Sequence, residues 1–156
     1  MVIYVSGKFS HGNTELSAFD LALLDMGVAN YNIIRLSSVI PPDSKVVETE
    51  FMPRIHGGIW GDRLYAVYAD ARTSKVGESV YAGVGWVLDE EGKGLFVEHE
   101  GHSEEEVSKL IDDSLNDLMT NRGMAKLDIR KKIVGGKCTD QPVCALVVSI
   151  YEREQW

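Results

Sequence analysis

Two adjacent serines stand at the end of an apolar, strand-like segment and are followed closely by two prolines. The block reads Arg35-Leu36-Ser37-Ser38-Val39-Ile40-Pro41-Pro42. The prolines fix the backbone and remove two N–H donors, which ends a strand. In one interpretation the hydroxyls only satisfy loose backbone groups at the strand end. In the other, a serine hydroxyl attacks the preceding carbonyl, and a strained backbone drives the attack.

A carboxylate, Asp20, falls within an apolar arc of a predicted helix. At about 100° per residue, this arc holds Leu16, Phe19, Leu23, Leu24 and Met26. Asp20 lies inside the arc, whereas Asp25 points away from it. A carboxylate that faces an apolar layer is costly unless it is paired or hydrogen-bonded. Asp20 is therefore predicted to make a local cap or an internal ion pair, or else to receive a cationic ligand.

Acidic residues alternate along a third segment, Phe96-Val97-Glu98-His99-Glu100-Gly101. In a strand, Glu98 and Glu100 share one face and His99 takes the other, which disfavours a metal site that uses Glu and His together. Glu98 follows an apolar run, so we expect it to be partly desolvated and suited to general-acid work. The alternative is a solvated strand end.

Two helices are predicted, Glu15–Met26 and Glu104–Arg122. The first has Asn13 or Thr14 as its N-cap and Gly27 just after its end. The second opens with Ser103 and Glu106 at the spacing of a capping box, and its apolar residues repeat at helical spacing.

The rest of the chain is predicted to form strands: Val2–Ser6, Tyr31–Ser38, Arg63–Arg72, Val80–Leu88, Gly94–Glu100, Leu127–Val134 and Val143–Tyr151. Several are apolar on both faces and need cover on both sides. Two helices with this many strands indicate an α+β fold, in which β-sheets pack face to face with the helices outside, an αββα-type sandwich. We expect residues 1–156 to form a single domain.

The amino-acid composition limits the classes of partner that the protein can bind. The chain has 156 residues, 44% of them apolar, and its charges sum to 16 minus 24, or −8. This acidic balance argues against nucleic-acid binding and is compatible with cationic partners. No apolar run approaches the roughly 20 residues of a membrane span. Cys138 and Cys144 match neither a zinc pattern nor a disulfide framework, so we expect reduced thiols in a cytoplasmic protein.

Three motifs together resemble the pyruvoyl-dependent arginine decarboxylases. They are Leu16-Ser17-Ala18-Phe19-Asp20, the block from Asn32 to Pro42, and Glu98-His99-Glu100-Gly101. The Arg-x-Ser-Ser-x-x-Pro-Pro part is the most specific, and the order of the motifs extends the likeness over most of the chain. The segment Glu48–Asp62, with Arg54 and His56, is more polar than expected of the family.

The resemblance implies a precursor that cuts itself between Ser37 and Ser38. The Ser38 hydroxyl would attack the Ser37 carbonyl to give an ester, and β-elimination followed by hydrolysis would leave a pyruvoyl group in place of Ser38. The products would be a β chain of residues 1–37 and an α chain of residues 38–156. The pyruvoyl group would be the covalent cofactor, in the role that pyridoxal phosphate has elsewhere, and no metal is expected.

The implied reaction converts L-arginine to agmatine and CO2. Glu98 would protonate the carbon that loses CO2, Asp20 would bind the guanidinium, and Asn32 would hydrogen-bond an oxyanion. Two alternatives stay open. The substrate could be another basic amino acid such as histidine, because a carboxylate does not distinguish among cations. The chain could also be an uncleaved binding homologue without activity.

Asn32 and Ser38 lie six residues apart on one predicted strand, which corresponds to roughly 20 Å. If both serve one site, either the strand folds back or Asn32 reaches the site of a neighbouring protomer. We favour the second arrangement, which agrees with the homotrimer, or dimer of trimers, expected of the family.

Overall fold

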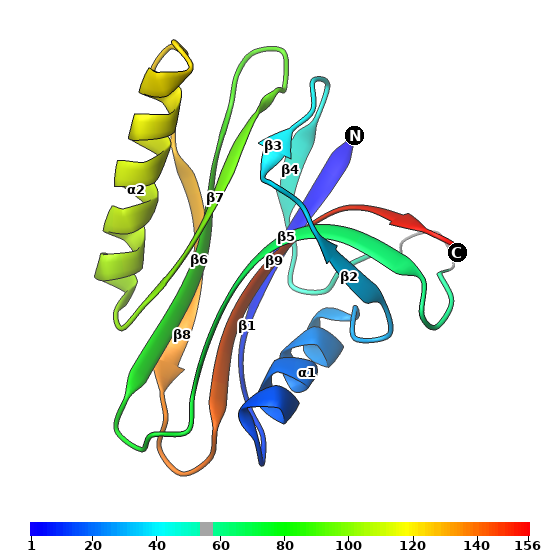
Figure 1. Ribbon diagram of the computed structural model, residues 1–156, viewed down its shortest axis with the longest axis vertical. Helices are drawn as coiled ribbons and strands as arrows, with labels where there is room; N and C mark the ends of the chain where they lie inside the picture. The colour runs from blue at the N-terminus through cyan, green and yellow to red at the C-terminus, as the bar shows by residue number, and fades with distance from the viewer. Residues whose placement is uncertain (54–57) are drawn as a thin grey trace.

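Two β-sheets pack face to face between two helices, so the molecule has four layers (Figure 1). The computed structural model describes residues 1–53 and 58–156, and Arg54 and His56 lie outside the described residues. Helix α1 (Glu15–Met26) covers the outer face of the five-stranded sheet, and α2 (Glu104–Asn121) covers the outer face of the four-stranded sheet. The predicted α+β sandwich with outer helices is confirmed.

The five-stranded sheet has the order β2-β5-β9-β1-β4. Its strands are β1 (Val2–His11), β2 (Asn32–Arg35), β4 (Lys45–Glu48), β5 (Arg63–Thr73) and β9 (Val143–Glu154). The four-stranded sheet has the order β3-β7-β6-β8, with β3 (Val39–Ile40), β6 (Ser79–Leu88), β7 (Gly94–Gly101) and β8 (Arg130–Lys137). The short edge strand β4 was not predicted from the sequence. It pairs in parallel with β1, a long-range contact that its four residues do not encode locally.

The largest side chains of the core lie between the two sheets. Trp86 and Phe96 are fully buried there, with ring centroids 6.1 Å apart, and they pack near Ile3 and Val147. A second apolar layer joins α1 to the five-stranded sheet, and a third joins α2 to the four-stranded sheet. The inner layer fixes the spacing of the sheets and therefore of any side chain that points between them.

Helix α1 has the predicted ends, but it buries a different face. Its N-cap Thr14 and Ser17 form a capping box, and Gly27 ends it in the left-handed conformation at φ 82°. The buried residues are Ala18, Ala22, Leu23 and Met26. Leu16 and Leu24 are 67% and 50% exposed, so the predicted apolar arc around Asp20 is wrong. The small alanines let the helix approach the sheet closely, and a count of large apolar residues overlooks that face.

Helix α2 begins at the predicted N-cap, but its capping box is only half formed. The Ser103 hydroxyl accepts the Glu106 N–H at 3.1 Å, while the Glu106 carboxylate accepts the N–H of His102 at 2.7 Å rather than that of Ser103. Among the described residues, no helix has the length and apolar character needed to cross a membrane. Cys138 and Cys144 are free and buried.

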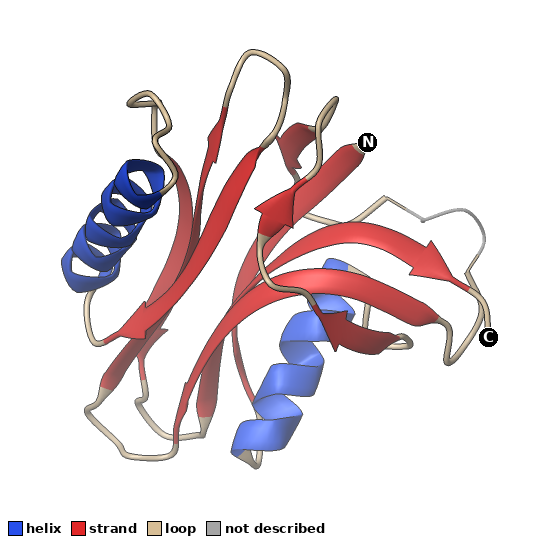
Figure 2. Cartoon of the chain, turned by 45° about the horizontal axis from the view of Figure 1, so that its top comes forward, coloured by secondary structure: helices blue, strands red, loops and turns tan. Residues whose placement is uncertain are grey.

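The predicted strand Tyr31–Ser38 is wrong in its second half. The chain leaves the five-stranded sheet after Arg35 and enters the four-stranded sheet at Val39, where β3 pairs with β7 (Figure 2). Ser38, at the crossing point, has a φ of 72°. Residue by residue the segment has strand character, but its two halves pair with different sheets, so the backbone turns between them.

Candidate active site

Ser38 occupies the crossing between the two sheets in a backbone conformation that L-residues seldom adopt. Its φ of 72° lies in the left-handed region, which costs a residue with a Cβ roughly 1–2 kcal/mol. Two hydrogen bonds hold the flanks. The Leu36 N–H donates to the Ala66 carbonyl at 2.9 Å in one sheet, and the Phe96 N–H donates to the Ser38 carbonyl at 2.8 Å in the other. The strain that the sequence could only suggest is present at this serine.

Glu98 lies against the Ser38 side chain. The Ser38 Oγ donates a short hydrogen bond to the Glu98 Oε1, which joins residues far apart in sequence. Along β7, Phe96 and Glu98 face the space between the sheets, and Phe96 is 1% exposed while Glu98 is half-buried. The expected partial desolvation of Glu98 therefore matches its position. The pair can move a proton between a hydroxyl and a carboxylate.

Tyr151 completes the surroundings of this pair, and sequence reasoning missed it. Its hydroxyl donates to the Val39 carbonyl at 3.1 Å, and its ring centroid lies 6.0 Å from that of Phe96. Burial, with a smaller contribution from the charge of Glu98, raises the pKa of Tyr151. Tyr151 is the last residue of the predicted apolar strand Val143–Tyr151, where its sequence context indicates only a core residue. No spacing in the sequence links it to Ser38.

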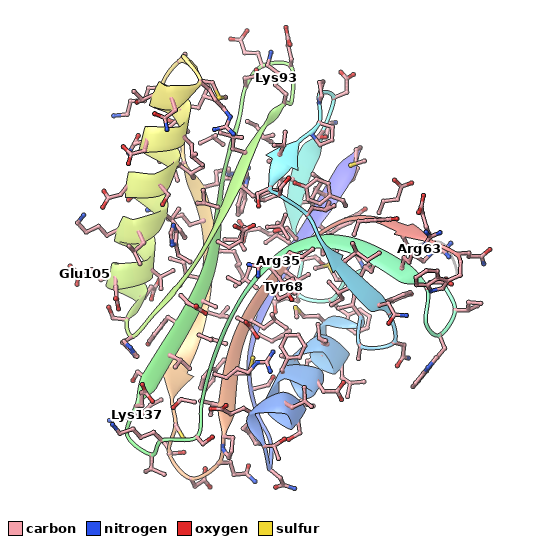
Figure 3. All side chains as sticks on the ribbon, in the orientation of Figure 1. Arg35, Arg63, Tyr68, Lys93, Glu105 and Lys137 are labelled. Carbon is pink, nitrogen blue, oxygen red and sulfur yellow. The ribbon has the colours of Figure 1, made fainter. Side chains whose placement is uncertain are left out.

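A small acidic cavity of about 220 Å³ adjoins Glu98. It is lined by Arg35, Ala69, Asp70, Glu98, His99 and Glu100. The Arg35 guanidinium packs over the Tyr68 ring at 4.8 Å and donates to the Tyr68 carbonyl at 3.0 Å, as Figure 3 shows near the centre of the molecule. The lining residues therefore include three acidic residues and one arginine, and the Asp70 carboxylate is paired with Arg72. This balance suits a small cationic molecule.

His99 points the other way from its neighbours, as strand alternation predicts. Its Nε2 lies 2.7 Å from the Ser114 Oγ of α2. Burial lowers the pKa of His99, and the charge of Glu98 offsets this in part. Within residues 1–53 and 58–156, no group of three or more His, Cys, Asp and Glu side chains is arranged to hold a metal ion.

Asp20 lies apart from Ser38 and Glu98 within one chain. It is exposed on α1, which packs on the face of the five-stranded sheet that points away from the other sheet (Figure 1). Asp20 thus neither faces an apolar layer nor reaches the space in which Glu98 lies. The sequence interpretation placed it among buried leucines, whereas Leu16 and Leu24 are exposed beside it.

Asn32 also lies apart from Ser38. It begins β2, where its Nδ2 donates to the Gly61 carbonyl at 2.6 Å. The chain stays extended from Asn32 to Leu36, roughly 13 Å at about 3.3 Å per residue, and then crosses to the other sheet. Among the described strands β2 pairs only with β5, so the chain does not fold back over Asn32.

Known proteins resemble this chain over three quarters of its length or more. A sequence model of the family described as pyruvoyl-dependent arginine decarboxylase matches residues 1–151. A protein of that name from Thermococcus kodakarensis is 30% identical over 150 residues, which cover 94% of this chain and 92% of the relative. One from Pyrococcus furiosus is 32% identical over 146 residues, which cover 90% of this chain and 88% of the relative. One from Halobacterium salinarum is 35% identical over 117 residues, which cover 75% of this chain and 67% of the relative.

Proposed function

Since the chain belongs to the pyruvoyl-dependent arginine decarboxylases, a family of carboxy-lyases, we propose that it converts L-arginine to agmatine and CO2 with a pyruvoyl group made from its own Ser38. The observation that carries this proposal is the geometry of Ser38. Its backbone is left-handed and its hydroxyl contacts a half-buried carboxylate. Strained backbone conformations of this kind cluster at active sites, where the strain is part of the mechanism.

The first step is self-cleavage between Ser37 and Ser38. Glu98 takes the proton from the Ser38 hydroxyl, and the Oγ attacks the Ser37 carbonyl carbon. The peptide C–N bond breaks as an ester forms, and the freed Ser38 nitrogen takes up a proton. Loss of the Ser38 Cα proton then expels the Ser37 carboxylate and leaves dehydroalanine. Water converts this residue to a pyruvoyl group and ammonia is released.

The residues around position 38 fit such a group. The Phe96 N–H holds the carbonyl of residue 38, and Glu98 contacts the side chain from which the group would form. When present, the pyruvoyl group supplies a carbonyl that binds the substrate amine and draws off the electrons released with CO2. Glu98 returns a proton to the substrate carbon. A positioned acid of this kind typically contributes about 10²–10⁴-fold to the rate.

The single domain of residues 1–156 would persist after cleavage into residues 1–37 and 38–156. The shorter chain carries β1, α1 and β2. Strand β1 pairs with β9 from Tyr4 to His11, and β2 pairs with β5. Helix α1 adds an apolar layer against the same sheet. These contacts are non-covalent, so the two chains would separate only under denaturing conditions.

Asp20 and Asn32 would act on the site of a neighbouring protomer. Asp20 is on α1, outside the five-stranded sheet, whereas Glu98 faces the space between the sheets. One chain therefore does not join them, but a homotrimer or a dimer of trimers can. Leu16 and Leu24 leave an apolar surface on both sides of Asp20, which a partner would cover. Covering it would dry the surroundings of the carboxylate and strengthen its pairing with a guanidinium.

Denaturing mass spectrometry of the purified protein tests the proposal, together with an assay for the product amine. We expect two chains divided after Ser37, the longer one beginning with a pyruvoyl group, and agmatine formed from L-arginine. Histidine and lysine serve as competing substrates. Turnover of histidine in preference to arginine would contradict the substrate, and a single intact chain would contradict the mechanism.

A further inference from the structure

We propose that Tyr151 is a positioning residue for self-cleavage: its hydroxyl holds the Val39 carbonyl and thereby keeps Ser38 in the left-handed conformation from which its hydroxyl would attack the Ser37 carbonyl. This role rests on the proposed function. Tyr151 does not touch the reacting atoms and is not a catalytic residue. It acts through the backbone that follows Ser38.

Three hydrogen bonds tether the segment that crosses between the sheets. Upstream, the Leu36 N–H binds the Ala66 carbonyl of β5. At the centre, the Phe96 N–H of β7 binds the Ser38 carbonyl. Downstream, Tyr151 of β9 binds the Val39 carbonyl. The tethers alternate between the two sheets, so the tyrosine bond ties the start of β3 back to the five-stranded sheet.

The downstream tether matters because Ser38 is strained. A serine at φ 72° returns to an extended conformation if the peptide planes beside it can rotate. The Phe96 bond fixes the plane between residues 38 and 39, and the Tyr151 bond fixes the next one. Without the tyrosine hydroxyl, the downstream side keeps its anchors to β7, which are the Phe96 bond and the pairing of β3, but it loses its tie to the five-stranded sheet. The serine then spends less time with its Oγ aimed at the attacked carbonyl.

The environment suits Tyr151 to this task. Its ring packs on Phe96, whose buried side chain belongs to the core between the sheets, so the ring has a fixed position. A tyrosine hydroxyl with its ordinary pKa of about 10 is already protonated at neutral pH, and burial raises the pKa of Tyr151 further, so the hydroxyl is a donor throughout the neutral range. A phenylalanine would keep the packing and lose only the bond, which makes the contribution of the hydroxyl separable.

The experiment compares Tyr151→Phe with Tyr65→Phe in the full-length chain. The Tyr65 hydroxyl also makes one hydrogen bond on the same sheet, at 2.8 Å, but its partner is Glu154 at the end of β9 and not the segment that crosses between the sheets. Freshly synthesised protein is followed by denaturing mass spectrometry, which gives both the cleavage rate and the group that begins the longer chain. We expect Tyr151→Phe to cut about tenfold more slowly than the wild type and Tyr65→Phe to cut normally.

A second readout separates positioning from stability. If the segment is loose, water reaches the ester before elimination, and a larger share of the longer chain begins with serine instead of pyruvoyl. A merely structural role would leave this share unchanged and would slow cleavage only in proportion to the unfolded fraction, measured by thermal unfolding. Equal rates and products in Tyr151→Phe and wild type would overturn the role of Tyr151 alone. An uncut wild-type chain would overturn the proposed function and this role with it.

Discussion

At the scale of single residues, the proposed chemistry depends on the strained Ser38 and on the carboxylate beside it. The serine hydroxyl contacts Glu98 although the two residues lie far apart in the chain. Ser37, by contrast, offers only its carbonyl to the proposed cleavage. The two serines look equivalent in the sequence but differ in what the reaction needs from them.

The paired serines therefore provide a direct test. Ser38→Ala lacks the attacking oxygen, so we expect no cleavage and no pyruvoyl group. Ser37→Ala keeps the attacked carbonyl and is expected to cut at a rate within a few-fold of wild type. Mass spectrometry of both variants checks this. Cleavage of Ser38→Ala at the same bond would show that the hydroxyl is not the nucleophile.

Asp20 is expected to govern substrate binding rather than chemistry. Asp20→Asn removes the charge that would pair with the guanidinium. We expect KM for arginine to rise by about ten- to a hundredfold with a smaller change in kcat, since hydrogen bonds to charged groups contribute about 1.5–3 kcal/mol. Asp25→Asn, at another exposed position of α1, is the matched control. An unchanged KM in steady-state assays of Asp20→Asn would remove it from the site.

At the scale of elements, alternate side chains of β7 point to opposite faces of the four-stranded sheet. Phe96 and Glu98 face the other sheet, while Val97 and His99 face α2. The strand thus carries the proposed acid on one side and is held in place by the helix on the other. Changes under α2 are expected to alter stability rather than the cleavage chemistry.

His99 gives this interface a predictable pH dependence. Its pKa is lowered in the folded protein, so between that value and the ordinary value of about 6.5 the unfolded chain binds more protons. The free energy of unfolding therefore falls as the pH drops below about 6.5. We expect His99→Gln to lose part of this pH dependence. Denaturant titrations at about pH 7.5 and about pH 5.5, one unit above and one unit below the ordinary histidine pKa, measure it. The exposed His102→Gln is the control, and an equal pH dependence in His99→Gln and wild type would contradict the prediction.

At the scale of the whole molecule, the fold exposes residues that the proposed reaction needs. Asn32 starts an edge strand and Asp20 lies on an outer helix, while Ser38 and Glu98 meet between the sheets. A second protomer is the simplest way to bring these groups together. If a second protomer does so, activity would belong to the assembly rather than to the single chain.

Shared sites predict complementation between inactive variants. In a mixed oligomer of Asn32→Ala and Ser38→Ala chains, the intact Ser38 of one chain meets the intact Asn32 of the other. We expect partial recovery of agmatine formation, with cleavage confined to the Asn32→Ala chain in the mass spectrum. As a control, an Asn32→Ala chain paired with a chain that carries both substitutions should stay inactive. Mixed oligomers that form without recovery would contradict shared sites.

The sequence by itself determined the features that depend on neighbours along the chain. Helix α1 has its predicted bounds, Glu15–Met26, because its cap and its terminal glycine are local signals. The αββα sandwich followed from the number of strands and their apolar faces. The paired serines before two prolines marked the segment in which cleavage is proposed, and the alternation of β7 assigned Glu98 to one face and His99 to the other.

The tertiary structure alone decided how these pieces meet. The crossing at Ser38, the contact of Tyr151 with Val39 and the pairing of β4 with β1 join segments that are distant in sequence. Asp20 is exposed because α1 packs on the sheet through another side, the one that carries the small residues Ala18 and Ala22. The spacing of residues along a chain reflects local geometry. The strain at Ser38 and its contact with the Glu98 carboxylate depend instead on contacts that form only when the sheets pack.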